Sequence, residues 1–187
     1  MLSITYLAGM IRQWAVARNI VDGATQKDQA LKLQSEFGEL CGNVDLLSNP
    51  YLLVSDRNDL LKKVVDDIGD NFVVLTILAA QQKERIETIE VGYYDGSCDH
   101  IYKLGQVYGK LCDSVLKGDS KSVSECIGLA HYHLRELSCE LDLQFQTCIA
   151  EAYKDIKDRR GIMYNGAFIK STDSRYLACC EEIGVQP

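Results

Sequence analysis

The chain has 187 residues, a net charge of −7 and a hydrophobic content of 47%. These values are typical of a globular protein with a sizeable core, and the acidic balance argues against nucleic acid as the main partner, because phosphate backbones select basic surfaces. No apolar run reaches the length of a membrane span. Eight cysteines occur without a CxxC pair, which favours reduced thiols in a cytoplasm over disulfides or a structural zinc site.

Apolar residues recur at helical spacing and only two prolines interrupt the chain, so we predict an all-α fold, an antiparallel helical bundle. Thr25 and Asp28 have the spacing of a capping box, and Asp142 is expected to cap the last long helix. A break is expected at 92–97, and Asn165-Gly166 predicts the turn of a small hairpin. The predicted helices cover residues 2–18, 25–47, 55–82 with Ser55 or Asp56 as cap, 99–116, 120–140 with Asp119 or Ser120 as cap, 142–160, and a short stretch at 174–183.

Two segments of the chain are similar to each other. Residues 33–44 read LQSEFGELCGNV and residues 104–115 read LGQVYGKLCDSV, so that Phe37 corresponds to Tyr108. We interpret this as a duplication whose second copy is degenerate. The predicted division is a first repeat at 1–92, a second repeat at 93–142, and a C-terminal helix and tail at 143–187 that complete the site.

Two acidic pairs lie within the apolar helical runs of the first repeat. Glu36 and Glu39 are three residues apart, as are Asp67 and Asp70, and this spacing places both members of a pair on one helix face. Four carboxylates between two helices would repel each other unless a cation lay among them. Oxygen ligands of this kind favour Mg²⁺, with Mn²⁺ as an alternative.

Glycines accompany both acidic pairs. Gly38 lies within the first pair and Gly69 within the second, and glycine inside a helix costs stability. A close approach of helices, or a substrate lying against the backbone, would account for them. The second repeat keeps glycines at the matching places but has Val107, Lys110, Cys126 and Leu129 in place of the four acids.

The first repeat and the tail together resemble a known family. WAVARNI, LQSEFGELCGNV and KKVVDDIGDNFVVLTILAAQ, followed by the tail AYKDIKDRRGIMYNGAFIK, resemble the MazG-like all-α nucleoside triphosphate pyrophosphohydrolases, especially those of bacteriophages. That family carries an ExxE motif on one helix and ExxD on the next. Here Asp67 replaces the usual Glu of the second motif. The additional degenerate repeat is similar to the arrangement of the related dimeric dUTPases.

The resemblance implies a magnesium-dependent hydrolysis of nucleoside triphosphates to monophosphates and pyrophosphate. It implies metal ligands at Glu36, Glu39, Asp67 and Asp70, with Glu36 or Glu39 also accepting a proton from the attacking water. The implied substrate-binding residues are Trp14, Arg18, Asn71, Lys157, Arg159, Arg160 and Lys170. Core packing remains open for Trp14, and favourable charge at a helix C-terminus remains open for the basic residues of the tail.

Alternative functions and assemblies also remain open. The chain could be a narrow dUTPase or dCTPase, a nucleotide-binding regulator without turnover, or a helical adaptor. The resemblance implies a homodimer, whereas the duplication offers an intrachain pseudo-dimer. The expected setting is cytoplasmic, in the host cytoplasm if a phage encodes the chain, with no membrane or nucleic acid as partner. His131 and His133 are expected to be structural or surface residues.

Overall fold

The computed structural model describes residues 2–90 and 99–186, and these residues are mostly helical, as predicted. The predicted break at 92–97 lies outside the described residues. Within the described ranges no helix is both long and apolar enough to cross a membrane. The elements are α1 Ile4–Ala17, α2 Ile20–Gly23, α3 Gln26–Leu47, α4 Val54–Gln81, the 3₁₀ helix η1 Ile86–Thr88, α5 His100–Lys117, α6 Ser120–Glu140, α7 Phe145–Lys157, β1 Gly161–Tyr164, β2 Ala167–Lys170 and α8 Tyr176–Ile183.

Polar caps fix several of the helix starts. The capping box of Thr25 and Asp28 is present at the start of α3, Asp99 accepts from the backbone N–H of Tyr102 at the start of α5, and Asp119 caps α6. Each carboxylate or hydroxyl satisfies a backbone N–H that has no partner within its helix. These starts confirm the predicted ones.

Two predicted caps are wrong. Asp142 adopts a left-handed backbone conformation with φ of 55°, which reverses the chain after α6, so that α7 begins three residues later, after Gln144. Neither Ser55 nor Asp56 caps α4, because that helix begins at Val54 and its N-cap residue makes no side-chain bond. The last long helix also ends at Lys157 instead of continuing to Gly161.

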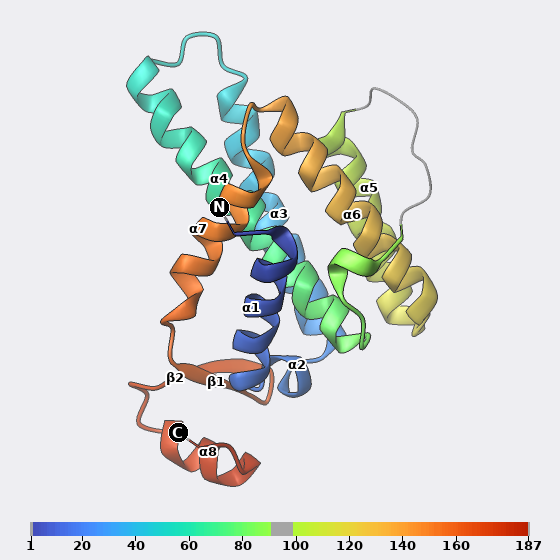
Figure 1. Cartoon of the computed structure of the whole chain (residues 1–187), viewed down its shortest axis with the longest axis vertical. Coiled ribbons are helices and arrows are strands. Elements are labelled where there is room, and N and C mark those ends of the chain that lie inside the picture. The colour runs from blue at the N-terminus through green and yellow to red at the C-terminus, as the bar shows by residue number, and fades with distance from the viewer. Residues whose placement is uncertain (1, 91–98, 187) are drawn as a thin grey trace.

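Helices α3 and α4 form one long antiparallel pair, and α5 and α6 form a second pair that lies beside it (Figure 1). In this arrangement α3 packs against α5 and α4 packs against α6, while α1 and α7 cover α4 on another side. The side chain of Phe37 meets that of Tyr108 edge-to-face, with ring centroids 5.1 Å apart. The two positions that the predicted duplication aligns therefore touch each other, and a twofold relation between the predicted repeats would produce such a contact.

The two glycines of the acidic helices differ in their surroundings. A Cβ atom at Gly69 would overlap the carbonyl oxygen of Cys148 and the Cβ atom of Ala152. This glycine therefore allows α4 and α7 to approach closely. At Gly38 nothing lies within 4 Å of a Cβ position, so close helix packing within the chain does not account for it.

The C-terminal tail forms the predicted hairpin and a short helix. Strands β1 and β2 are antiparallel with Tyr164 opposite Ala167, and both turn residues, Asn165 and Gly166, have positive φ. Two positive φ angles are characteristic of a tight two-residue hairpin turn. Helix α8 packs on this hairpin, away from the helical bundle (Figure 1), and the two share a small apolar cluster that includes the buried Cys179 and Cys180.

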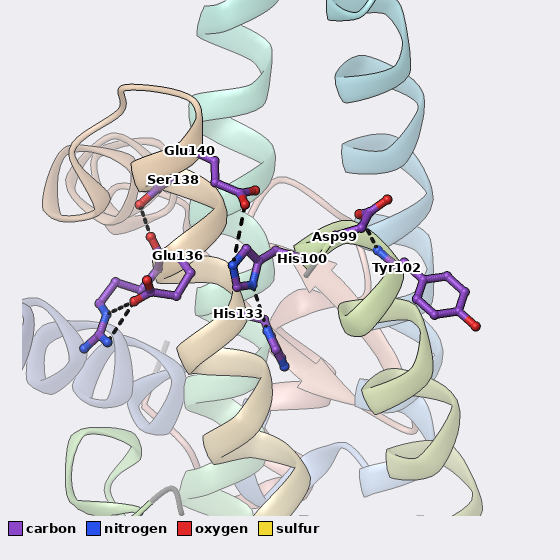
Figure 2. A network of polar contacts seen from close by, with 8 residues as sticks. Asp99, His100, Tyr102, His133, Glu136, Ser138 and Glu140 are labelled. Atoms are coloured by element: carbon purple, nitrogen blue, oxygen red, sulfur yellow. Dashed lines mark hydrogen bonds and ion pairs between the residues drawn. The ribbon is translucent and has the colours of Figure 1, made fainter. Parts of the chain in front are cut away.

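A histidine pair links α5 to α6. The Nδ1 atoms of His100 and His133 are 2.9 Å apart, and Nε2 of His100 lies 3.6 Å from Glu140 (Figure 2). Burial, together with the neighbouring His100, lowers the pKa of His133 to about 4. His133 is therefore a structural residue, as expected from the sequence.

Candidate functional site

The predicted acidic residues lie along the facing sides of α3 and α4. Glu36 and Asp67 are 4% and 7% exposed, Asp70 is half-buried and Glu39 is exposed. Carboxylates are seldom buried without partners, so the burial of two of them needs a physical explanation. The packing of the two helices against each other accounts for it.

The buried carboxylates have polar partners from α3. The Lys32 ammonium pairs with Glu36 one turn further along the helix. The side-chain amide of Asn43 donates to Asp67 Oδ2 at 2.7 Å. Among the described residues, no group of three or more His, Cys, Asp or Glu side chains stands in an arrangement that could hold a metal ion.

Both carboxyl groups of the second acidic pair, Asp67 and Asp70, have raised pKa values. Burial raises the pKa of Asp67 to about 6, with Glu39 and Asp66 adding to the shift and the amide of Asn43 opposing it. Burial also raises the pKa of Asp70 to about 7, with added repulsion from Asp66 and Glu36. Glu36 and Asp70 line the same pocket, so one acid from each predicted pair lies near the other.

By chemical type alone the four predicted acids would suit a divalent cation that prefers oxygen, although among the described residues they do not stand as a ligand group. Glu36, Glu39, Asp67 and Asp70 offer only carboxylate oxygens, which suit Mg²⁺ and Mn²⁺. Burial is the main cause that raises the pKa values of Asp67 and Asp70, and it does so by disfavouring their charged forms. A bound cation would favour those charged forms.

A pocket of about 320 Å³ opens beside two of the predicted acids, while Glu39 and Asp67 are not part of its lining. Glu36 and Asp70 line it together with Lys32 and Arg159, and its remaining wall is largely apolar. The apolar wall includes Trp14 from α1, Val73 and Ile77 from α4, and Met163 and Phe168 from the hairpin. The first repeat and the tail together build this pocket, since its lining residues come from α1 to α4, from α7 and its end, and from the hairpin.

The predicted basic residues of the tail divide between two places. Arg159 lines the pocket and also a neighbouring hollow, in which Arg160 and Lys170 lie with Ser171 and Thr172. Lys157 is exposed, with its ammonium 3.9 Å from Asp158. The structure thus brings Arg159 to the acidic residues and leaves the other three cations outside the pocket wall.

Two further predicted substrate-binding residues, Asn71 and Arg18, make hydrogen bonds within the protein. Asn71 is fully buried, accepts from the Tyr108 hydroxyl at 3.1 Å and donates to the Asp67 carbonyl at 2.8 Å. It therefore joins α4 to α5. The guanidinium of Arg18 donates to main-chain carbonyls of α1 and of the end of α7. Neither residue lines the pocket.

Sequence reasoning missed several residues around this site. Lys32 could have been found, because it lies four residues before Glu36 and shares its helix face. Asn43 lies four residues after Glu39 on the same helix, but its side chain contacts Asp67 on the other helix. Phe168 and Met163 line the pocket only because the hairpin folds back.

Comparisons with known proteins give one partial match. Residues in this chain are 41% identical over 81 residues to a protein of Haemophilus phage HP1 (strain HP1c1) described as an uncharacterized 18.2 kDa protein in the rep-hol intergenic region. The match spans 43% of this chain and 42% of that protein. No family model matches the chain, and no solved structure matches it.

Proposed function

We propose that this chain is a Mg²⁺-dependent nucleoside triphosphate pyrophosphohydrolase. The observation that carries the proposal is the pocket in which carboxylates of α3 and α4 lie beside Arg159 and an apolar wall with two aromatic side chains. A nucleotide presents the same three chemical features, since it has a flat base, a charged phosphate chain and phosphate-bound metal. The resemblance of both ends of the chain to MazG-like proteins supports the same conclusion.

The acidic residues have two roles in this proposal. Glu36, Glu39, Asp67 and Asp70 hold Mg²⁺ or Mn²⁺, which when bound supplies charge neutralisation at the phosphates and lowers the pKa of water. Glu36 or Glu39 accepts the proton of the attacking water. Because Glu36 is paired with Lys32, that pair must open before Glu36 can hold a cation.

The remaining pocket residues bind the nucleotide. Arg159 faces the carboxylates from the end of α7 and contacts phosphate oxygens, for which a guanidinium is well suited. Trp14 and Phe168 provide aromatic surface for the base. Arg160 and Lys170, in the hollow next to the pocket, and the exposed Lys157 add positive charge to the tail, which attracts a polyanion to an otherwise acidic protein.

The proposal is tested by incubating the chain with each common ribo- and deoxyribonucleoside triphosphate and Mg²⁺. We expect monophosphate and pyrophosphate in equal amounts. Hydrolysis of dUTP or dCTP alone would establish the narrow enzyme. Release of inorganic phosphate in place of pyrophosphate would contradict the proposal. A thermal shift with nucleotide and Mg²⁺ but no product would identify a nucleotide-binding regulator instead.

A further inference from the structure

The junction between α1 and α2 holds together parts of the chain that are far apart in sequence. Arg18 is the C-cap residue of α1, and Asn19 follows it in a left-handed conformation with φ of 54°. Both side chains point their donors at backbone carbonyls of residues 157–163. The junction therefore contacts the segment that connects α7 to the hairpin.

Arg18 caps the end of α7. Its Nε donates to the Arg159 carbonyl at 2.6 Å and its Nη2 donates to the Lys157 carbonyl at 3.2 Å. The last carbonyls of a helix, such as that of Lys157, have no partner within it, and Arg159 follows just beyond the helix end, so one guanidinium holds both the last turn of α7 and the segment after it. Because one of these carbonyls belongs to Arg159 itself, Arg18 fixes the backbone from which the Arg159 side chain enters the pocket.

Arg18 also contacts Trp14, which lines the pocket from α1. Its Nη1 donates to the Trp14 carbonyl at 3.3 Å, and its guanidinium carbon lies 5.2 Å from the centre of the Trp14 ring. A guanidinium at this distance from an indole is attracted to it. Trp14 and Arg159, which both line the pocket, are thus connected through one side chain.

Asn19 attaches the hairpin. Its side-chain amide donates to the Met163 carbonyl at 3.0 Å, and the backbone N–H of Met163 donates to the Arg18 carbonyl at 2.8 Å. Met163 lines the pocket next to Phe168. Two hydrogen bonds therefore keep β1 against the α1–α2 junction and hold the hairpin wall in place.

We infer that Arg18 and Asn19 are positioning residues that fix Arg159, Trp14 and Met163 around the nucleotide. This inference rests on the proposed function and refines it, since Arg18 acts through backbone carbonyls and through Trp14 and leaves phosphate binding to Arg159. Small displacements of a binding group have large kinetic effects. The metal-binding carboxylates lie on α3 and α4 and are independent of this junction.

The first test compares Arg18→Gln with Arg57→Gln. Arg57 is a matched control, because its Nη1 donates to the Leu47 carbonyl at the end of α3, at 3.0 Å, and it does not line the pocket. For Arg18→Gln we expect KM for the triphosphate to rise about tenfold and kcat to change less than about threefold, as for a loss of uniform binding. Arg57→Gln is expected to leave both constants unchanged. Equal effects of the two variants would overturn the inference.

A double-mutant cycle with Arg159→Ala separates positioning from direct binding. If Arg18 acts through Arg159, Arg18→Gln has a much smaller effect in the Arg159→Ala background than in the wild-type chain. Additive losses would show that Arg18 contributes independently, and would overturn the inference. Mn²⁺ binding in the absence of nucleotide is expected to be the same in the wild-type chain and in Arg18→Gln.

Hydrogen exchange gives a readout that does not need catalysis. Asn19→Gly keeps the left-handed backbone, which glycine adopts freely, and removes only the bond to Met163. We expect faster exchange of the amides of residues 161–170 in Asn19→Gly and Arg18→Gln, and no change in Arg57→Gln. Unchanged exchange in the first two would overturn the inference. A wild-type chain that releases no pyrophosphate would instead refute the proposed function.

Discussion

At the scale of single residues, the acidic quartet determines the proposed chemistry, and Glu39 gives a clean test. Glu39 is exposed and its side chain is not needed for core packing. Glu39→Gln removes a ligand charge at nearly constant volume, so we expect turnover to fall by at least about a hundredfold with an unchanged circular dichroism spectrum. Normal activity in this variant would reject the site.

The raised pKa values of Asp67 and Asp70 predict how metal binding depends on pH. Both carboxyls must lose their protons to hold a cation, and their pKa values are about 6 and about 7. Metal affinity and hydrolysis are therefore expected to rise from pH 5 to pH 8. Titration with Mn²⁺ at a series of pH values measures this. A flat affinity over that range would contradict the assignment of these two ligands.

The same shifts predict the stability of the metal-free chain. Because the pKa of Asp70 in the folded state, about 7, lies above the ordinary value of an aspartate, the folded state binds more protons than the unfolded state. The free energy of unfolding therefore decreases as pH rises from about 4 to about 7. We expect Asp70→Asn to be more stable than wild type at pH 7.5, on the order of 1 kcal/mol or about 2–4 °C in Tm. The difference should vanish near pH 4, and a constant difference would show another cause.

At the scale of the elements, most of the helix pattern could be predicted from the sequence. Caps such as Thr25 and Asp119 act within three residues, and local signals of this kind are readable from the sequence. Asp142 looked like such a cap, but it turns the chain in a left-handed conformation. The role of Arg18 could not be predicted, because its carbonyl acceptors are 139 and 141 residues away.

The surroundings of the two glycines predict opposite effects of substitution, because Gly69 lies in the contact between α4 and α7 and Gly38 does not. Gly69→Ala places a methyl group against the backbone of Cys148, and we expect a loss of about 1–3 kcal/mol in unfolding free energy. Gly38→Ala meets nothing within 4 Å, and we expect a gain of about 0.5–1 kcal/mol from helix propensity. Urea denaturation measures both. If Gly38→Ala is stable but inactive, a substrate or a second copy lies against that backbone.

At the scale of the whole molecule, the pocket belongs to one part of the chain. Its lining residues come from the first repeat and the tail, while α5 and α6 contribute packing, as in the contact between Phe37 and Tyr108. The sequence could indicate that the acidic residues and the C-terminal tail belong to one site. It could not show that Phe168 and Trp14 face one pocket, since that depends on the hairpin folding back over α1.

This division predicts that the second repeat is silent in hydrolysis. Lys110 stands where Glu39 stands in the first repeat, and it does not line the pocket. We expect Lys110→Ala to retain kcat and KM within about twofold, whereas Glu39→Gln is inactive. A large loss in Lys110→Ala, measured by pyrophosphate release, would mean that the second repeat takes part in the chemistry.

The meeting of Phe37 with Tyr108 restricts how the two halves can change. Their rings are in edge-to-face contact between α3 and α5, and the Tyr108 hydroxyl also donates a hydrogen bond to Asn71. A bulkier ring on either side has room only if the opposite one becomes smaller. A change of size at one of these two aromatic positions therefore requires a compensating change at the other.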